Sequence, residues 1–100
     1  MSYLVHVSLH LNNDAPEVYD AAKQELAKLG LYSSVVGDTK KTSLLPRNTF
    51  SGTFEGESAV KIRDDLVSQI KEAFARSKVS ASTFISVAPG GWSWFRFTAG

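Results

Sequence analysis

The stretch LVHVSLHL, residues 4–11, alternates apolar and polar side chains. This period of two is typical of a β-strand, in which successive side chains point to opposite faces of a sheet. The aliphatic residues would face a core, and His6, Ser8 and His10 would share the other face. The stretch therefore predicts a strand over 3–11 with one buried face, and it places both histidines of the chain on the opposite face.

The rest of the chain switches between helical and strand periodicity. Apolar residues recur at three- and four-residue spacing over 15–29 and 58–76, which predicts two amphipathic helices. Segments rich in β-branched and aromatic residues predict further strands over 31–37, 47–55 and 82–88. A short extended piece at 42–45 is expected within the long polar connection that precedes the third strand.

Turn and capping residues support these boundaries. Asp14 is the expected N-cap of the first helix, with Glu17 three residues later, and Gly30 stands where a C-cap glycine is common. Gly52 interrupts a strand between Phe50 and Phe54, which predicts a bulge or a close approach of another backbone segment.

The resulting order is β-α-β-β-α-β. Two right-handed crossover halves of this kind form a four-stranded antiparallel sheet with both helices on one face, the α+β ferredoxin-like sandwich. We expect this domain to cover residues 1–88. The predicted core comprises Val5, Val7, Leu26, Phe50, Leu66, Ile70 and Ile85.

Residues 89–100 form an aromatic tail of the same domain, containing the sequence WSWFRF. Such a segment needs apolar cover. We expect a C-terminal fifth strand after the Pro89-Gly90-Gly91 hinge, paired with its own sheet or with the sheet edge of a second subunit. A homodimer is the expected state, and the predicted interface residues are Trp92, Trp94, Phe95 and Phe97.

The composition limits the classes of function. The net charge of +1 does not by itself indicate a nucleic-acid binder, and the absence of cysteine excludes disulfides and thiolate metal sites. No apolar run approaches the roughly 20 residues that span a bilayer, and no signal peptide precedes the first strand. A cytoplasmic protein without membrane contact is therefore expected, and no motif indicates a cofactor.

The central stretch GLYSSVVGDTKKTSLLPRNTFSGTF, residues 30–54, resembles the GhoS-type antitoxin endoribonucleases, a ferredoxin-like family related in fold to small CRISPR-adaptation proteins. The matching positions are Tyr32, Ser33, Ser34, Val35, Val36, Leu45, Asn48, Thr49 and Phe50. The resemblance implies a small RNA-acting protein that binds or cleaves single-stranded RNA of a target transcript, in a toxin–antitoxin or phage-defence setting. The aspartate that CRISPR-adaptation proteins carry late in the first strand is missing here, which argues against that metal-dependent mechanism.

His6 and His10 are the candidate acid and base of a metal-independent cleavage, with Arg47 as the cation that would hold the phosphate. Residues four apart on a strand are about 13 Å apart, so the two histidines cannot share one metal ion. The alternative is that they are surface residues on a solvated or interface-forming sheet face.

Lys40, Lys41 and Arg47 lie on the connection at 37–47 and are candidates for contact with a phosphate backbone. Ser8 and Asn48 are the other predicted RNA-binding residues. The paired aromatic residues of RNA-recognition modules are absent from the first and third predicted strands. The alternative function is a non-catalytic dimeric module that regulates a partner protein.

Overall fold

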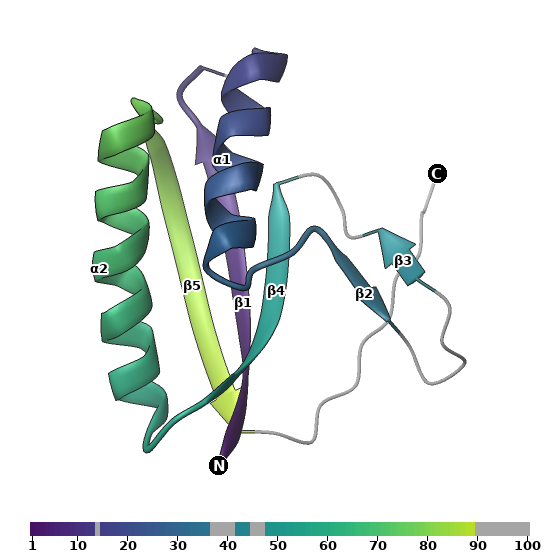
Figure 1. Ribbon diagram of the computed structural model, residues 1–100, viewed down its shortest axis with the longest axis vertical. Coiled ribbons are helices and arrows are strands. Elements are labelled where there is room, and N and C mark those ends of the chain that lie inside the picture. Colours follow the sequence, from purple (N-terminus) through teal and green to yellow (C-terminus); the bar gives the residue numbers. More distant parts are fainter. Residues whose placement is uncertain (14, 37–41, 45–47, 90–100) are drawn as a thin grey trace.

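The structure is a computed structural model that describes residues 1–13, 15–36, 42–44 and 48–89 (Figure 1). Its elements follow the order strand, helix, three strands, helix and strand. They are β1 (Ser2–Leu11), α1 (Pro16–Lys28), β2 (Ser34–Val36), β3 (Thr42–Leu44), β4 (Thr49–Glu55), α2 (Ala59–Ser77) and β5 (Ala81–Pro89). Both helices begin and end within one residue of their predicted positions.

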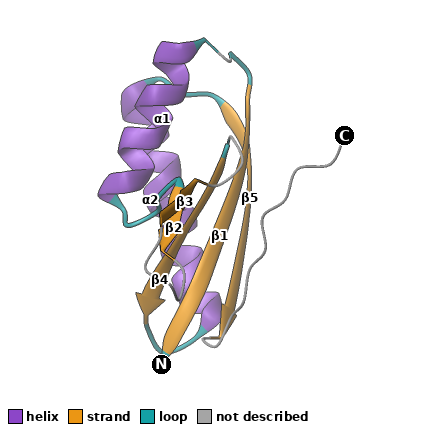
Figure 2. Cartoon of the chain, turned by 90° about the vertical axis from the view of Figure 1, so that its right-hand side faces the viewer, coloured by secondary structure: helices purple, strands orange, loops and turns teal. Residues whose placement is uncertain are grey.

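A three-stranded antiparallel sheet in the order β4-β1-β5 forms the centre of the α+β fold. Both helices cover the same face of this sheet (Figure 2). Val7 of β1 lies opposite Phe50 of β4 and Ile85 of β5, so apolar side chains from all three strands meet beneath the helices. The first strand is therefore the central strand, and its predicted register is confirmed.

The predicted four-stranded sheet is not what the described residues form. Among the described residues of the predicted strand at 31–37, only Tyr32 pairs with β4, and its backbone exchanges hydrogen bonds of 2.8 and 2.9 Å with Ser51. Residues Ser34–Val36 instead pair with Thr42–Leu44 as the separate hairpin β2-β3 (Figure 1). The partner strand lies close along the chain, so the loop that joins the two strands costs little entropy to close.

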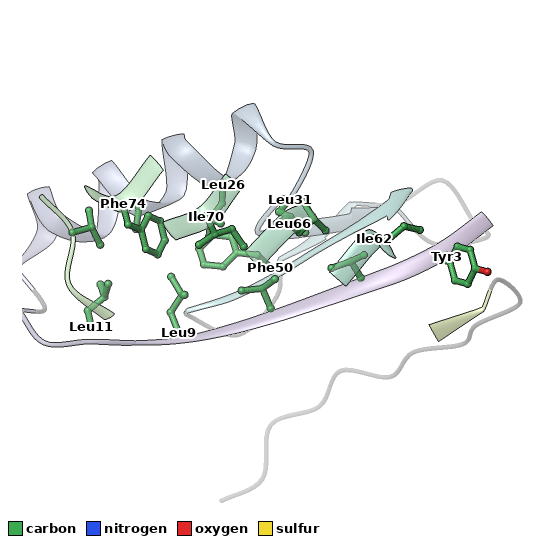
Figure 3. Packing of buried hydrophobic residues seen from close by; sticks show 14 residues of the cluster. Tyr3, Leu9, Leu11, Leu26, Leu31, Phe50, Ile62, Leu66, Ile70 and Phe74 are labelled. Carbon is green, nitrogen blue, oxygen red and sulfur yellow. The ribbon is translucent and has the colours of Figure 1, made fainter. Parts of the chain in front are cut away.

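The hydrophobic core lies between the sheet and the helices (Figure 3). Six of the seven predicted core residues are buried, and the seventh, Ile85, is partly buried and packs against the others. The apolar stripe of α2 is fully buried, as predicted: Ile62, Leu66, Ile70, Ala73 and Phe74. No helix in the described part of the chain is long and apolar enough to cross a membrane.

Gly30 ends α1 in the manner expected of a C-cap glycine. Its φ angle is +91°, and its N–H donates to the carbonyl of Ala27 at 3.0 Å. The next N–H, from Leu31, donates to Leu26 at 2.9 Å, so both carbonyls of the last turn are paired. Leu26 and Leu31 are both fully buried, which fixes the end of the helix against the core.

The start of α1 differs from the prediction. Its N-cap is Ala15, which provides no capping side chain, and Asp14 lies outside the described residues. The side-chain oxygen of Asn13 accepts a hydrogen bond of 3.0 Å from the N–H of Ala15, so the asparagine turns the chain into the helix. Pro16 then occupies the first helical position, where its missing N–H is harmless.

Candidate nucleic-acid interface

The candidate site is the sheet face that the helices leave uncovered, called here the open face. Its central part comprises His6, Ser8 and His10 of β1, Thr49, Ser51 and Thr53 of β4, and Ser82, Phe84 and Ser86 of β5. The alternation of burial along β1 places the histidines on this face, because Val5, Val7, Leu9 and Leu11 are buried beneath the helices. His6 and His10 are both exposed, as the sequence predicted.

The strand register surrounds the histidines with hydroxyl groups. His6 lies between Ser51 of β4 and Ser86 of β5, and His10 lies opposite Ser82. Neighbouring strands are about 4.8 Å apart, so each of these hydroxyls is in the row next to an imidazole ring. Serine and threonine hydroxyls both donate and accept hydrogen bonds, as imidazole nitrogens do. The open face therefore presents polar groups without fixed charge along most of its centre.

Besides Tyr32, which is 53% exposed and pairs with Ser51 at the β4 edge, the open face carries one large aromatic side chain in the described residues, Phe84. It is 66% exposed and lies directly opposite Ser8, in the row between those of His6 and His10. Sequence reasoning missed this residue, although the signal was present. Because Ile85 was expected in the core, the strand period of two required its neighbour Phe84 to face the other way.

His6 and His10 do not form a metal centre. They are four residues apart on an extended strand, and the described residues contain no cluster of three or more histidine or acidic side chains that could hold a metal ion. The geometry leaves each histidine able to contact a different part of one extended ligand. The third predicted catalytic residue, Arg47, lies outside the described residues.

Asn48 is described at the point where the chain enters β4. Its φ angle is +67°, a conformation that asparagine tolerates better than most residues, and its carbonyl accepts a hydrogen bond of 2.9 Å from Leu9. Its side-chain oxygen is buried and has no hydrogen-bond partner among the described residues. The visible role of Asn48 is therefore to turn the chain into the sheet.

The remaining predicted site residues lie outside the described part of the chain. These are Lys40 and Lys41 of the basic connection and the tail residues Trp92, Trp94, Phe95 and Phe97. The positions of both segments in the chain follow from the described elements next to them. The basic connection flanks β3 and leads into β4, and the tail leaves from the end of β5.

In comparisons with known proteins, the chain matches no protein-family model and no curated protein.

Proposed function

We propose that this protein binds single-stranded RNA on the open face, with Phe84 as a stacking platform for one base. The observation that carries the proposal is the 66% exposed ring of Phe84 between the rows of His6 and His10. An apolar ring of this size has no cover in the described residues, although it stands among hydroxyl groups. A nucleotide offers both a π-face for the ring and polar groups for the hydroxyls.

The fold and the resemblance support the same function. A four-stranded ferredoxin-like sheet would arise if the segment that begins at the Tyr32–Ser51 bridge continued alongside β4. The resemblance of residues 30–54 to the GhoS-type antitoxin endoribonucleases supports an RNA ligand and a toxin–antitoxin role. The connection at 37–47 carries three basic residues and precedes β4, an edge of the same sheet, which favours their contact with a ligand that crosses this edge.

Cleavage of the bound RNA is a second candidate function, favoured by the exposure of both histidines on one face. One imidazole would take the proton of a 2′-hydroxyl, and the other would protonate the leaving 5′-oxygen. Arg47 would hold the phosphate between them. This mechanism needs no metal ion, so the cleavage would persist in EDTA and would be lost when His6 or His10 is changed to alanine.

The binding experiment compares two exposed apolar side chains on different surfaces. Phe84→Ala removes the ring from the open face, whereas Val60→Ala truncates a 56% exposed residue on α2. We expect Phe84→Ala to raise the dissociation constant for an AU-rich single-stranded RNA by about tenfold, because stacking on one aromatic ring is worth about 1–3 kcal/mol. Val60→Ala should bind as the unchanged protein does, in fluorescence anisotropy at low salt.

A failure of the unchanged protein to bind RNA at low salt would overturn the proposal. Equal loss of affinity in both variants would assign the loss to destabilisation rather than to stacking. The alternative reading, a non-catalytic dimeric module that regulates a partner protein, would then account better for the exposed ring of Phe84.

A further inference from the structure

β5 is an edge strand of the described sheet. Its hydrogen bonds to β1 determine which of its residues point their N–H and C=O groups outward. The N–H of Asn12 donates to the carbonyl of Ser80 at 3.0 Å, which places Ser80 in a hydrogen-bonded pair with β1. Such pairs recur at every second residue in an antiparallel ladder. The even-numbered residues of β5 therefore bond to β1. The N–H and C=O groups of Ala81, Thr83, Ile85 and Val87 point away from the sheet, where no described strand pairs with them.

This edge lacks the features that normally block strand pairing. Its nine residues, ASTFISVAP, contain no charged side chain, and each of them from Ala81 to Pro89 pairs in unbroken register with β1. Natural edge strands of this length usually carry a lysine, a bulge or an inward-pointing charge. The only proline stands at the last position, where it does not interrupt the ladder.

An apolar groove runs beside the same edge. A cavity of about 470 Å³ opens between α2 and β5, and Val67, Ile70, Phe74 and Ile85 contribute to its wall. Val60 lies two helical turns before Val67 on the same side of α2 and is 56% exposed. Phe84 is exposed on the other face of β5. Uncovered apolar surface therefore lies on both sides of one strand edge.

We propose that this edge is the docking site of the chain's own residues 92–98, which pair with β5 as a hairpin closed by Gly90 and Gly91. Eleven residues follow β5, and they begin where its edge ends. The residues that flank a two-residue loop face each other as a hydrogen-bonded pair, and Pro89 is one of the outward-facing residues of β5. Its carbonyl can accept the loop-closing hydrogen bond from the N–H of Trp92, although proline has no N–H to donate in return. Gly-Gly suits such a loop because its tight turn needs positive φ angles.

The phase of β5 then fixes the register of the added strand. Trp92 lies opposite Pro89, Trp94 opposite Val87, and each later residue pairs one step further back along β5. Both tryptophans fall on the helix side, beside Pro89 and Val87, which follow the part of β5 that lines the groove. Arg96 falls on the helix side as well, where its aliphatic stem can lie along the groove while the guanidinium group stays in water.

The other two aromatic residues fall on the open face. Phe95 lies opposite Ser86, and Phe97 lies opposite Phe84 in a non-hydrogen-bonded pair, in which cross-strand side chains approach most closely. A single register thus places apolar tail residues beside Val60 and along one edge of the Phe84 ring, and it leaves the outer face of that ring open to a base. It also places Phe95 and Phe97 near Phe84 at the edge of the open face.

A pair of engineered cysteines tests this register, because the natural chain contains none. Ala88→Cys with Ser93→Cys joins two residues that face each other, whereas Ser86→Cys with Ser93→Cys joins residues two positions out of register. Directly opposed Cα atoms lie about 4.5 Å apart, within the range of a disulfide, and the offset pair exceeds the roughly 7 Å limit.

We expect the first double variant of the full chain to form an intramolecular disulfide at least about tenfold faster than the second, at dilute protein concentration and with mild oxidant. Mass spectrometry of the intact protein would record the loss of two hydrogens. Equal rates for the two pairs would show an unpaired tail and would overturn the proposal. A disulfide that links two chains on a non-reducing gel would overturn it in favour of the homodimer with exchanged tails.

A second measurement is independent of any cysteine. In the hairpin, the outward N–H groups of Ile85 and Val87 are hydrogen-bonded, so their exchange with deuterated solvent is slowed. Gly90→Val with Gly91→Val disfavours the positive φ angles of the loop, whereas Gly90→Asn retains them. Protection of Ile85 and Val87 in the unchanged protein and in Gly90→Asn, with loss in the double valine variant, is the expected result. No protection in the unchanged protein would overturn the proposal.

Discussion

The carbonyl oxygen of Gly30 occupies the space that a Cβ atom on Gly52 would need. Gly30 ends α1 with a φ angle of +91°, and Gly52 lies in the middle of β4, opposite Val5. A Cβ atom on Gly52 would collide with this carbonyl and would lie 3.0 Å from the ring of Phe54. The end of the first helix is therefore seated on the sheet at a point where no side chain fits between them.

Gly52→Ala should destabilise the protein by about 1–3 kcal/mol, the usual cost of forcing extra atoms into a packed site. The obstacle is backbone held by the hydrogen bonds of the helix end, so it cannot move aside as a flexible side chain can. Urea unfolding followed by circular dichroism measures the change. Ser51→Ala is the matched control, since its side chain is on the open face, and it should change stability by less than about 0.5 kcal/mol. Equal midpoints for the two variants would contradict the tight approach.

The sequence predicted most of the main frame. Glycine between two aromatic residues of a strand indicated either a bulge or a close backbone approach at Gly52, and the structure shows the close approach, made by the carbonyl of Gly30. The helices were predictable because the apolar residues of each recur at the spacing of a helix and not at the two-residue spacing of a strand. The central strand was predictable because a shift of one residue would have exposed all of its aliphatic side chains.

The pairing of residues 34–36 was not predictable in the same way. These residues have two available partners, the edge of β4 and the segment at 42–44, and periodicity does not distinguish between them. In the open face, the histidines followed directly from alternation. Phe84 was not among the predicted site residues, although the same alternation places it on the face opposite to that of Ile85.

The N-terminus of α2 depends on one hydroxyl group. The side chain of Ser58 accepts a hydrogen bond of 3.1 Å from the N–H of Lys61, one of the N–H groups that the helix itself leaves unpaired. Ser58→Ala should therefore lower the free energy of unfolding by about 1 kcal/mol. Ser58→Asp should retain the cap, and Ser68→Ala, an exposed change within the helix, should be nearly neutral. Thermal unfolding that places Ser58→Ala level with Ser68→Ala would rule out this role for the cap.

Glu25 connects the two helices and should make stability depend on pH. Its carboxylate accepts a hydrogen bond of 3.2 Å from Lys28 of its own helix and lies 3.7 Å from Arg76 of α2. The hydrogen bond from Lys28, then that from Ser77 and the charges of Lys28 and Arg76, hold the pKa of Glu25 below its ordinary value of 4.5, against partial desolvation.

A lowered pKa in the folded state stabilises the protein above pH 4.5, and this contribution is lost as the pH falls through the folded-state pKa. Glu25→Gln should therefore be less stable than the unchanged protein at pH 7, and the difference should shrink in acid. Glu57→Gln is the control. It makes the same change in net charge at an exposed side chain that forms no ion pair with any described residue. Denaturant unfolding of the three proteins at neutral and acidic pH tests this expectation, which fails if the deficit of Glu25→Gln is the same at both.

Binding of RNA should depend on salt through the basic connection that leads into β4. If Lys40, Lys41 and Arg47 each neutralise one phosphate, changing all three to alanine should weaken binding to single-stranded RNA. It should also reduce the slope of the logarithm of affinity against the logarithm of salt concentration by about 2, since each contact with a single strand contributes about 0.7. The physical reason is that each cation releases condensed counterions from the RNA when it binds.

The control removes the same number of positive charges from the helix layer. Lys23, Lys61 and Lys71 are exposed on the helices that cover the other face of the sheet. Their replacement by alanine lowers the net charge by the same amount and should leave the slope almost unchanged, because exposed charges act over only about 10 Å at 0.1 M salt. Titrations of a labelled RNA at several salt concentrations compare the two triple variants. Equal slopes would mean that net charge alone governs binding, and the basic connection would then have no specific contact with the RNA.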